Sequence, residues 1–381
     1  MSPEGGSRSS RGNNCDSAVA NTNLVPAIAP AESIKTYSPA TVKDFVSTSN
    51  RSPQNTSTLE ITQAGGMENI RSLISKQGFS ESVTDIIMDS WRDSTKKQYG
   101  SFLNRWFKFS RDNDIDPVSP SLAQTCDYLM HLYSQGLSYS AINTARSALS
   151  SFISTKNGVS FGQEPIVVRL MNGFFNRRAT TPRYTSIWNP DVVMGFLKDK
   201  SVSSPTLKEL TFKLLMLLAL GTAQRCQTFH LMDITLMDIT DDRVTFNFDE
   251  PLKHEKAGKT RLPVSIQASQ DKDLCVIRTL KQYLTLTQPL RKHNTRLFIS
   301  YCKPHKPVTR DTLRRWIITT MTMAGVNTKI FKAHSTRAAS TSASLRKGVP
   351  LSSILKAAQW SSLDTFKTFY DKPLDNTNWN I

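Results

Sequence analysis

Two prolines divide the C-terminal end of the chain into short segments whose helical periodicity brings particular polar side chains together. Pro350 and Pro373 each end a helical pattern, because proline lacks a backbone N–H and clashes with the preceding turn. Before Pro350 the sequence has few helix breakers, so side chains three or four residues apart share one helix face. His334 and Arg337 are three residues apart. The sequence therefore predicts a pocket that receives both an imidazole and a guanidinium.

The segments after Pro350 bring two aromatic side chains toward the same pocket. One apolar-periodic run leads to Trp360, and a further run ends at Tyr370, shortly before the second proline. Tyr370 therefore ends a short helix, and its ring can turn toward the pocket. A phenol is a poor nucleophile at neutral pH unless cations around the attacked group stabilise the charge that develops.

Two upstream segments supply further cations. An apolar helix within residues 214–234 ends at Gly221, and Arg225 opens the next helix. Residues 244–266 alternate between apolar and polar side chains on both sides of a basic turn, which is typical of a β-hairpin. The turn holds three lysines, Lys253, Lys256 and Lys259.

These residues, in this order, resemble the tyrosine recombinase (phage integrase-like) family. In that family an arginine and a hairpin lysine precede His-x-x-Arg, and an aromatic residue or histidine and then a tyrosine follow it. The resemblance covers residues 183–381, and the helical region before them resembles the family's DNA-clamping domain. It implies six catalytic residues: Arg225, Lys253, His334, Arg337, Trp360 and Tyr370.

The implied chemistry is phosphoryl transfer by a covalent tyrosine among fixed cations. Arg225 and Arg337 can each hold non-bridging phosphate oxygens through two N–H groups, and both stay charged at any working pH. Tyr370 is then the nucleophile that attacks phosphorus.

The remaining side chains complete the implied site. A lysine on a mobile hairpin can protonate the leaving 5′ oxygen when neighbouring cations lower its pKa. We choose Lys253 for this role, and Lys256 and Lys259 stay open because hairpin register is not fixed by the sequence. His334 can hydrogen-bond a phosphate oxygen or the tyrosine, and the indole N–H of Trp360 can donate to phosphate.

The sequence departs from the family pattern at two places. An acidic residue often stands three residues after the first arginine, where this chain has Thr228. The Leu-Gly-His signature before the tyrosine is replaced by Ala358-Gln359-Trp360. Both variations resemble the eukaryotic branch carried by DIRS-type retrotransposons and Cryptons more than the phage or bacterial branch.

The charge of the chain indicates a polyanionic partner, most simply nucleic acid. The 381 residues carry a formal net charge of +17, and the first 80 residues hold only seven of the 48 Lys/Arg and six of the 31 Asp/Glu. The excess positive charge therefore belongs to the part of the chain that folds. The resemblance implies double-stranded DNA as the partner and a homotetramer on that DNA.

Neither a metal site nor a cofactor site is predicted. The carboxylates are not grouped as a two-metal site requires, and no Gly-rich phosphate loop is present. The five cysteines are scattered and include no C-x-x-C pair, so we expect a reducing compartment; Cys302 and His305 have a ligand-like spacing but lack a second pair. Without a membrane-spanning run or a signal-peptide pattern, we expect an intracellular protein, nuclear if the eukaryotic branch applies.

The predicted fold class is mainly α with a small antiparallel β-sheet, a helical DNA-clamping domain followed by a tyrosine-recombinase catalytic domain. Residues 1–65 are rich in Ser, Thr, Asn, Pro and Gly, so we predict a disordered arm. The helical N-terminal core DNA-binding domain then spans residues 66–178, a linker 179–186 and the catalytic domain 187–381.

Within these limits the patterns predict individual elements. In the helical domain we expect helices that begin at Ser94, at Ser119-Pro120 and at Ser138, and a fourth at PIVVRLMNGFFNRRA. In the catalytic domain we expect a helix at 309–324 and three antiparallel strands, near 243–249, 261–266 and 296–300.

Exposed Lys and Arg side chains on these elements are candidates for phosphate contacts, which fix register without reading sequence. For each residue singly, a solvated surface charge is the alternative. We interpret Arg310 as part of an amphipathic surface. The candidates for DNA contacts are Lys96, Lys97, Arg146, Arg177, Arg178, Arg183, Arg314 and Arg315.

The sequence thus predicts a site-specific DNA recombinase or integrase of a mobile element that works through a 3′-phosphotyrosine intermediate, without metal or ATP. A type IB topoisomerase shares this chemistry, and a tetramer on DNA would argue against it. A catalytically silent DNA-binding protein derived from a mobile element is the alternative from another class, against which the intact Tyr370, Arg225 and Arg337 argue.

Removing residues 1–65 should leave DNA affinity and its dependence on salt unchanged. The arm is nearly neutral, so the counterions released on binding come from cations in the remainder of the chain. Binding of the full and truncated chains to one duplex, measured over a range of salt concentrations, checks this. A large loss of affinity in the truncated chain would show that the arm binds DNA.

Overall fold

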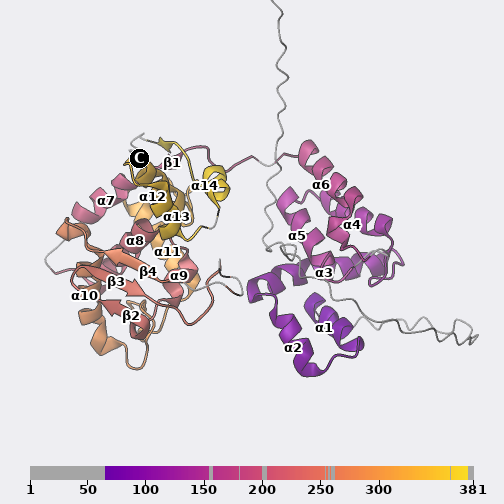
Figure 1. The fold of residues 1–381 in the computed structure, drawn as a ribbon, viewed down its shortest axis with the longest axis horizontal. Helices are drawn as coiled ribbons and strands as arrows, with labels where there is room; N and C mark the ends of the chain where they lie inside the picture. The colour runs from indigo at the N-terminus through magenta and orange to yellow at the C-terminus, as the bar shows by residue number, and fades with distance from the viewer. Residues whose placement is uncertain are drawn as a thin grey trace, which may run out of the picture. The chain divides into compact units, whose positions relative to one another are not determined.

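The computed structural model describes residues 65–153, 158–179, 181–199, 204–253, 255, 258, 262–360 and 362–375. The predicted disordered arm, apart from its last residue, lies outside these ranges, as do Lys256 and Lys259. In Figure 1 the colour follows the chain from indigo at the N-terminus to yellow at the C-terminus. The elements before and after residue 180 are described separately. No helix within the described ranges is long and apolar enough to cross a membrane.

The elements before residue 180 are helical. They are α1 (Gly66–Lys76), α2 (Glu81–Asp89), α3 (Asp93–Asp112), α4 (Leu122–Ser134), α5 (Tyr139–Leu149), a 3₁₀ turn (Phe161–Gln163) and α6 (Pro165–Arg177). Helix α3 packs against α1 and α5, and α4, α5 and α6 pack against one another. Their core includes the buried Trp106, whose indole N–H donates to the Pro117 carbonyl at 3.0 Å.

The helix starts follow local capping chemistry, which corrects two expectations. Helix α4 begins after Ser121 rather than at Ser119-Pro120, because Ser121 and Gln124 form a reciprocal capping box. Helix α3 begins at Asp93, since the Arg92 carbonyl already accepts bonds from the next turn; Ser94 therefore lies inside the helix and does not cap it. Ser138 caps α5 as predicted.

The elements after residue 180 combine helices with short strands. They are β1 (Ile187–Trp188), α7 (Pro190–Asp199), α8 (Leu207–Thr222), α9 (Cys226–Leu231), β2 (Met237–Ile239), β3 (Arg243–Phe246), β4 (Val264–Gln267), α10 (Val276–Thr287), α11 (Arg310–Met323), α12 (Ser335–Arg346), α13 (Leu351–Ala358), α14 (Leu363–Phe369) and β5 (Leu374–Asp375). Short 3₁₀ turns lie at Ile234–Leu236, Lys272–Leu274 and Gln288–Leu290. The mainly helical fold class with a small antiparallel sheet is confirmed.

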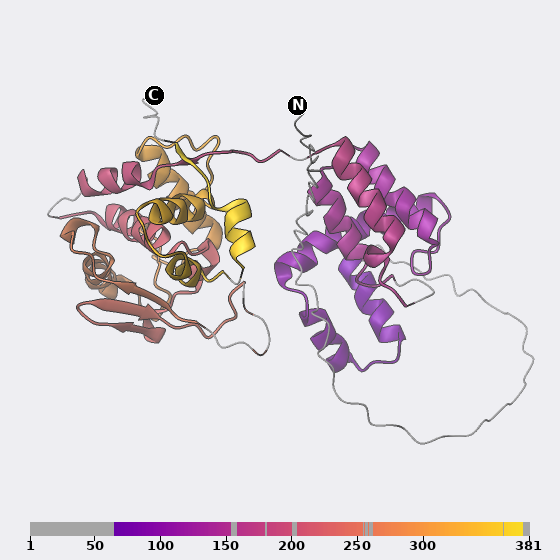
Figure 2. The same ribbon diagram turned by 45° about the horizontal axis from the view of Figure 1, so that its top comes forward.

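Helix α8 is the centre of this part of the chain. Eleven of its residues are buried, on all sides of the helix, and it packs against α10, α11 and α12. Figures 1 and 2 both show α8 between the sheet and α12. A helix that is apolar on all sides over residues 214–220 is stable only where other elements cover it all round.

The antiparallel sheet has the order β2-β3-β4, with Phe246 of β3 opposite Met237 on one side and Val264 on the other. The prediction of a third strand at 296–300 is wrong, because β2 occupies that place. Residues 296–300 make only isolated bridges. The buried Arg291 guanidinium also donates to the carbonyls of residues 296 and 297, at 2.7 and 2.8 Å.

A second, two-stranded sheet connects the two ends of this part of the chain. Strand β5 lies parallel to β1, with Leu374 opposite Ile187. The Ile187 N–H donates to the Pro373 carbonyl at 2.8 Å. The segment that follows Tyr370 is therefore fixed to the segment that precedes α7.

Replacing Gly66 by alanine should destabilise the contact between α1 and α3. A Cβ at this position would lie 2.5 Å from the Leu103 Cβ and 2.8 Å from the Asn104 backbone nitrogen, and such overpacking costs about 1–3 kcal/mol. Urea denaturation of the variant measures the change. Gly173→Ala in α6 is the control: its Cβ meets nothing within 4 Å, so it should stabilise by about 0.5–1 kcal/mol. A fully stable Gly66→Ala protein would contradict this packing.

Candidate active site

Helix α12 passes through the core because its side chains are small. All residues from Ser335 to Ala343 are buried, and most are Ala, Ser or Thr. The indole N–H of Trp188 in β1 donates to the Ser335 hydroxyl at 2.9 Å. His334 occupies the N-cap and Arg337 the first turn, so the predicted pair stands at the start of the helix.

Arg337 is a buried cation with unused hydrogen-bond donors. Its side chain is 1% exposed, and its Nη2 donates to the Ala358 carbonyl at 3.2 Å. Its Nε and Nη1 have no hydrogen-bond partner among the described residues. Burial, followed by the charge of Arg225, lowers the pKa of Arg337 to about 10, so it remains charged at neutral pH. A buried charge with free donors is costly unless an anion meets it, which makes this side chain suited to hold a phosphate.

The two aromatic rings close over this guanidinium. The Arg337 Cζ lies 5.0 Å from the centre of the Trp360 ring and 5.6 Å from that of Tyr370. The centres of the Trp360 and Tyr370 rings are 4.2 Å apart. The Trp360 indole N–H is buried and has no partner within the described ranges, so it is a third free donor beside Arg337.

Tyr370 ends α14, as predicted, and is half-buried. Its hydroxyl lies 3.1 Å from the His334 Nε2. Partial loss of water around the imidazole, followed by the charges of Arg337, Arg225 and Lys253, lowers the pKa of His334 to about 4. An imidazole with this pKa is neutral at neutral pH, so one of its ring nitrogens can accept a hydrogen bond from the phenol.

Arg225 and Lys253 complete a cluster of positive charge. Arg225 is half-buried at the N-cap of α9, and burial lowers its pKa. Lys253 is an exposed side chain, and partial loss of water, followed by the charge of Arg225, lowers its pKa. The same Arg225 charge lowers the pKa of Arg337. These shared effects place the cations in one electrostatic environment.

The position where the family often has an acid is filled by a chain of hydrogen bonds. Thr228 is buried and its hydroxyl donates to the Gln224 Oε1 at 3.2 Å. The Gln224 Nε2 donates to the Ala357 carbonyl at 2.8 Å. An amide and a hydroxyl thus connect the start of α9 to the end of α13 without adding a negative charge.

Sequence reasoning assigned no role to Gln359, which connects two parts of the site. Its backbone is left-handed, with φ of 54°, and its side chain is buried. The Gln359 Nε2 donates to the Leu262 carbonyl, next to β4, at 2.9 Å. The residue thus fixes the turn before Trp360 to the strand after the lysine hairpin. The departure from Leu-Gly-His was the available signal, because glycine is the residue that favours this backbone conformation.

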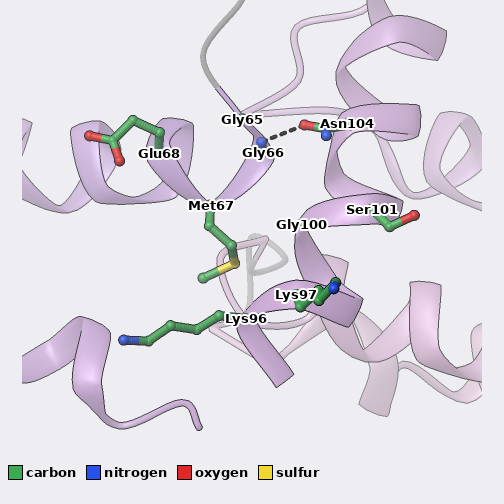
Figure 3. A pocket seen from close by; sticks show the side chains of 9 residues that line it. All are labelled: Gly65, Gly66, Met67, Glu68, Lys96, Lys97, Gly100, Ser101 and Asn104. Atoms are coloured by element: carbon green, nitrogen blue, oxygen red, sulfur yellow. Dashed lines mark hydrogen bonds between the residues drawn. The ribbon is translucent and has the colours of Figure 1, made fainter. Parts of the chain in front are cut away.

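The candidate DNA contacts before residue 180 differ in whether their charged groups already bond other residues of the protein. Lys96 and Lys97 lie beside a hollow of about 840 Å³ between α1 and α3 (Figure 3). Lys96 pairs with Asp89 at 2.8 Å, while Lys97 is exposed. The Arg146 Nη1 bonds the Gly162 carbonyl at 3.1 Å, so Arg146 contributes to the fold.

Among the other candidates, Arg178 has a structural contact and the rest extend into solvent. Its two terminal nitrogens bond the carbonyls of Leu137 and Tyr133, and its guanidinium lies 4.1 Å from the centre of the Tyr133 ring. The exposed candidates are Arg177, Arg183, Arg314 and Arg315, of which Arg315 bonds the Thr312 hydroxyl at 3.3 Å. All eight stay predictions as DNA contacts.

Comparison with known proteins finds a family that the C-terminal part of the chain resembles. Residues 197–376 match the model of the phage integrase family, and they include all six candidate catalytic residues. This part of the chain is therefore similar to the phage integrase family. Among curated proteins, none matches the chain.

Solved structures show that the fold is shared. XerH site-specific recombinase, bound to a palindromic difH substrate, matches with a TM-score of 0.50 and 16% identity, over 71% of this chain and 74% of that one. The Tn1549 transposon integrase, in complex with transposon right end DNA, matches with a TM-score of 0.52 and 13% identity, over 81% and 95%. The chain therefore shares the fold of these two proteins.

The imidazole of His334 should titrate with a midpoint near pH 4 in NMR spectra of the folded protein. An unfolded histidine titrates near 6.5, so between about pH 4 and 6.5 the unfolded chain binds the proton and the folded chain does not. This contribution to stability is complete above the unfolded value and falls as the pH drops through that window. Arg225→Gln should raise the midpoint, because it removes a neighbouring positive charge. A midpoint near 6.5 in the wild type would contradict the crowded, cationic setting.

Proposed function

We propose that this protein is a site-specific DNA recombinase or integrase that cleaves a DNA strand through a 3′-phosphotyrosine bond and rejoins strands by attack of a 5′ hydroxyl. The observation that carries the proposal is the Tyr370 hydroxyl, 3.1 Å from a neutral imidazole and beside a buried guanidinium with two free donors. That combination places a nucleophile, a proton acceptor and anion-binding groups together.

Each side chain has a place in the proposed step. The phenol oxygen attacks phosphorus and its proton passes to the His334 Nε2, while the bond from phosphorus to the 5′ oxygen breaks. The free N–H groups of Arg337 and the guanidinium of Arg225 stabilise the charge that develops on the non-bridging oxygens. Lys253, whose pKa is lowered, gives a proton to the leaving oxygen. The phosphotyrosine bond conserves the energy for the reverse step, so no ATP is consumed.

The partner in this proposal is double-stranded DNA, held by a homotetramer that exchanges strands through a four-way junction. The net charge of +17, most of it after residue 80, supports a polyanionic partner. The two structural neighbours named above were solved with DNA. We further propose a eukaryotic mobile element of the DIRS or Crypton type as the source, and hence the nucleus as the site of action, on the strength of Thr228 and Ala358-Gln359-Trp360.

Tyr370→Phe should abolish the covalent protein–DNA complex while leaving DNA binding intact, because the change removes only the attacking oxygen. The assay uses a library of nicked duplexes with a randomised core, whose short cut fragment diffuses away, and a denaturing gel that detects protein linked to a 3′ end. The wild type should give this band in the presence of a chelator, since arginines supply the positive charge.

Tyr184→Phe is the matched control, because it removes a hydroxyl from another half-buried tyrosine of the same part of the chain. It should leave the covalent band at wild-type strength. A band that persisted in Tyr370→Phe would assign the nucleophile to another residue, and a band lost with chelator would overturn the mechanism.

A further inference from the structure

The backbone on both sides of Tyr370 is bonded to one serine of α12. The Ser342 hydroxyl donates to the Tyr370 carbonyl at 2.6 Å and accepts from the Lys372 N–H at 3.1 Å. Its side chain is 0% exposed. The carbonyl and the N–H both lie just past the end of α14, where a helix leaves backbone groups without partners. One hydroxyl thus satisfies an acceptor and a donor in the turn that follows the tyrosine.

Three further backbone groups of this turn also have partners. The N–H groups of Tyr370 and Asp371 both donate to the Phe366 carbonyl, at 2.8 and 2.9 Å. The Pro373 carbonyl accepts from Ile187. Without Ser342, however, nothing in these contacts would bond the tyrosine turn to α12. Ser342 is thus the residue through which α12 bonds the main chain of this turn.

Helix α12 therefore holds Tyr370 at two points. His334 at its N-cap meets the phenol hydroxyl, and Ser342, eight residues further along the chain, meets the main chain. At a rise of about 1.5 Å per residue, these anchors are roughly 12 Å apart along the helix axis. Arg337 projects from the same helix between them. A rigid helix thus fixes both the distance and the direction of the phenol relative to the phosphate-binding donors.

We propose that Ser342 is a positioning residue that sets the place of the Tyr370 oxygen for attack on phosphorus. The proposal rests on the proposed function, since it assigns Tyr370 as the nucleophile. Nucleophilic attack requires the reacting atoms at about 3–3.5 Å and in line, and a misplacement of about 1 Å can cost a factor of about 10² in rate. Ser342 touches neither the phenol nor the phosphate, so it acts through the backbone.

A purely structural role is the competing explanation, and the chain offers a matched residue that distinguishes the two. Ser340 is also buried in α12, but its hydroxyl donates to the Leu220 carbonyl at the end of α8. Ser340→Ala and Ser342→Ala each remove one buried hydroxyl from the same helix. Both should lower the denaturation midpoint, but only Ser342→Ala should release the tyrosine turn.

The experiment compares the full chain with both variants. The substrate is a nicked duplex recovered from the randomised library by covalent capture with the wild type. Equilibrium binding gives the affinity, and single-turnover formation of the covalent complex at saturating DNA gives the rate. Hydrogen exchange of peptides covering residues 370–375, followed by mass spectrometry without DNA, reports the turn directly, because the Lys372 N–H loses its acceptor.

We expect Ser342→Ala to reduce the single-turnover rate by a factor of about 10–100, with affinity within about twofold of wild type, and to speed exchange in the turn. Ser340→Ala should match the wild type in single-turnover rate, in affinity and in hydrogen exchange of the turn. Ser342→Cys keeps the size and a weak donor, so it should recover part of the rate, and it takes the place of the alanine variant if that one does not fold.

Two results would overturn the positioning role alone: a wild-type rate in Ser342→Ala despite faster exchange, or unchanged exchange in the turn. Equal loss of rate in Ser340→Ala would also overturn it, because both hydroxyls would then act only through stability. A wild-type protein that forms no covalent complex with any duplex of the library would instead overturn the proposed function and this role together.

Discussion

The buried guanidinium of Arg337 is the interaction on which the rest of the site depends. A cation that is 1% exposed must be compensated by the groups around it, and here it finds one carbonyl and the faces of two aromatic rings. The protein leaves its Nε and Nη1 unsatisfied, and no acidic residue is placed against them by the contacts described. In the folded state, two hydrogen-bond donors of a buried cation therefore lack an acceptor beside Tyr370, where an anion would stabilise them.

The elements around Arg337 have small side chains or neutral polar groups. Small residues along α12 let the helix reach the core and bring its charged first turn there with it. Around it, Thr228, Gln224 and Gln359 bond backbone carbonyls and one another with neutral groups. These groups are uncharged, so they add no negative charge beside the cations. Neutral hydrogen bonds give the site rigidity while its positive charge stays available.

The sequence was sufficient for those features that depend on local pattern. The helix start at Ser138, the pairing of His334 with Arg337 one turn apart, the end of α14 at Tyr370 and the place of Arg225 before α9 all follow from periodicity, breakers and capping residues. The remaining features depend on contacts between distant residues. The segment expected as a strand at 296–300 makes only isolated bridges and bonds the Arg291 guanidinium, and no local pattern could show these contacts. The role of Ser342 likewise exists only because α12 and the tyrosine turn meet in three dimensions.

Strand β1 is hydrogen-bonded both to the segment after Tyr370 and to the start of α12. Its backbone bonds the Pro373 carbonyl, three residues after the tyrosine, and its Trp188 indole bonds Ser335, two residues before Arg337. The chain immediately before β1 is the segment that leads in from the helical elements. A movement of that segment would therefore reach Tyr370 and α12 together. Both would be displaced as one body, so the geometry between them would be conserved while the whole site moves.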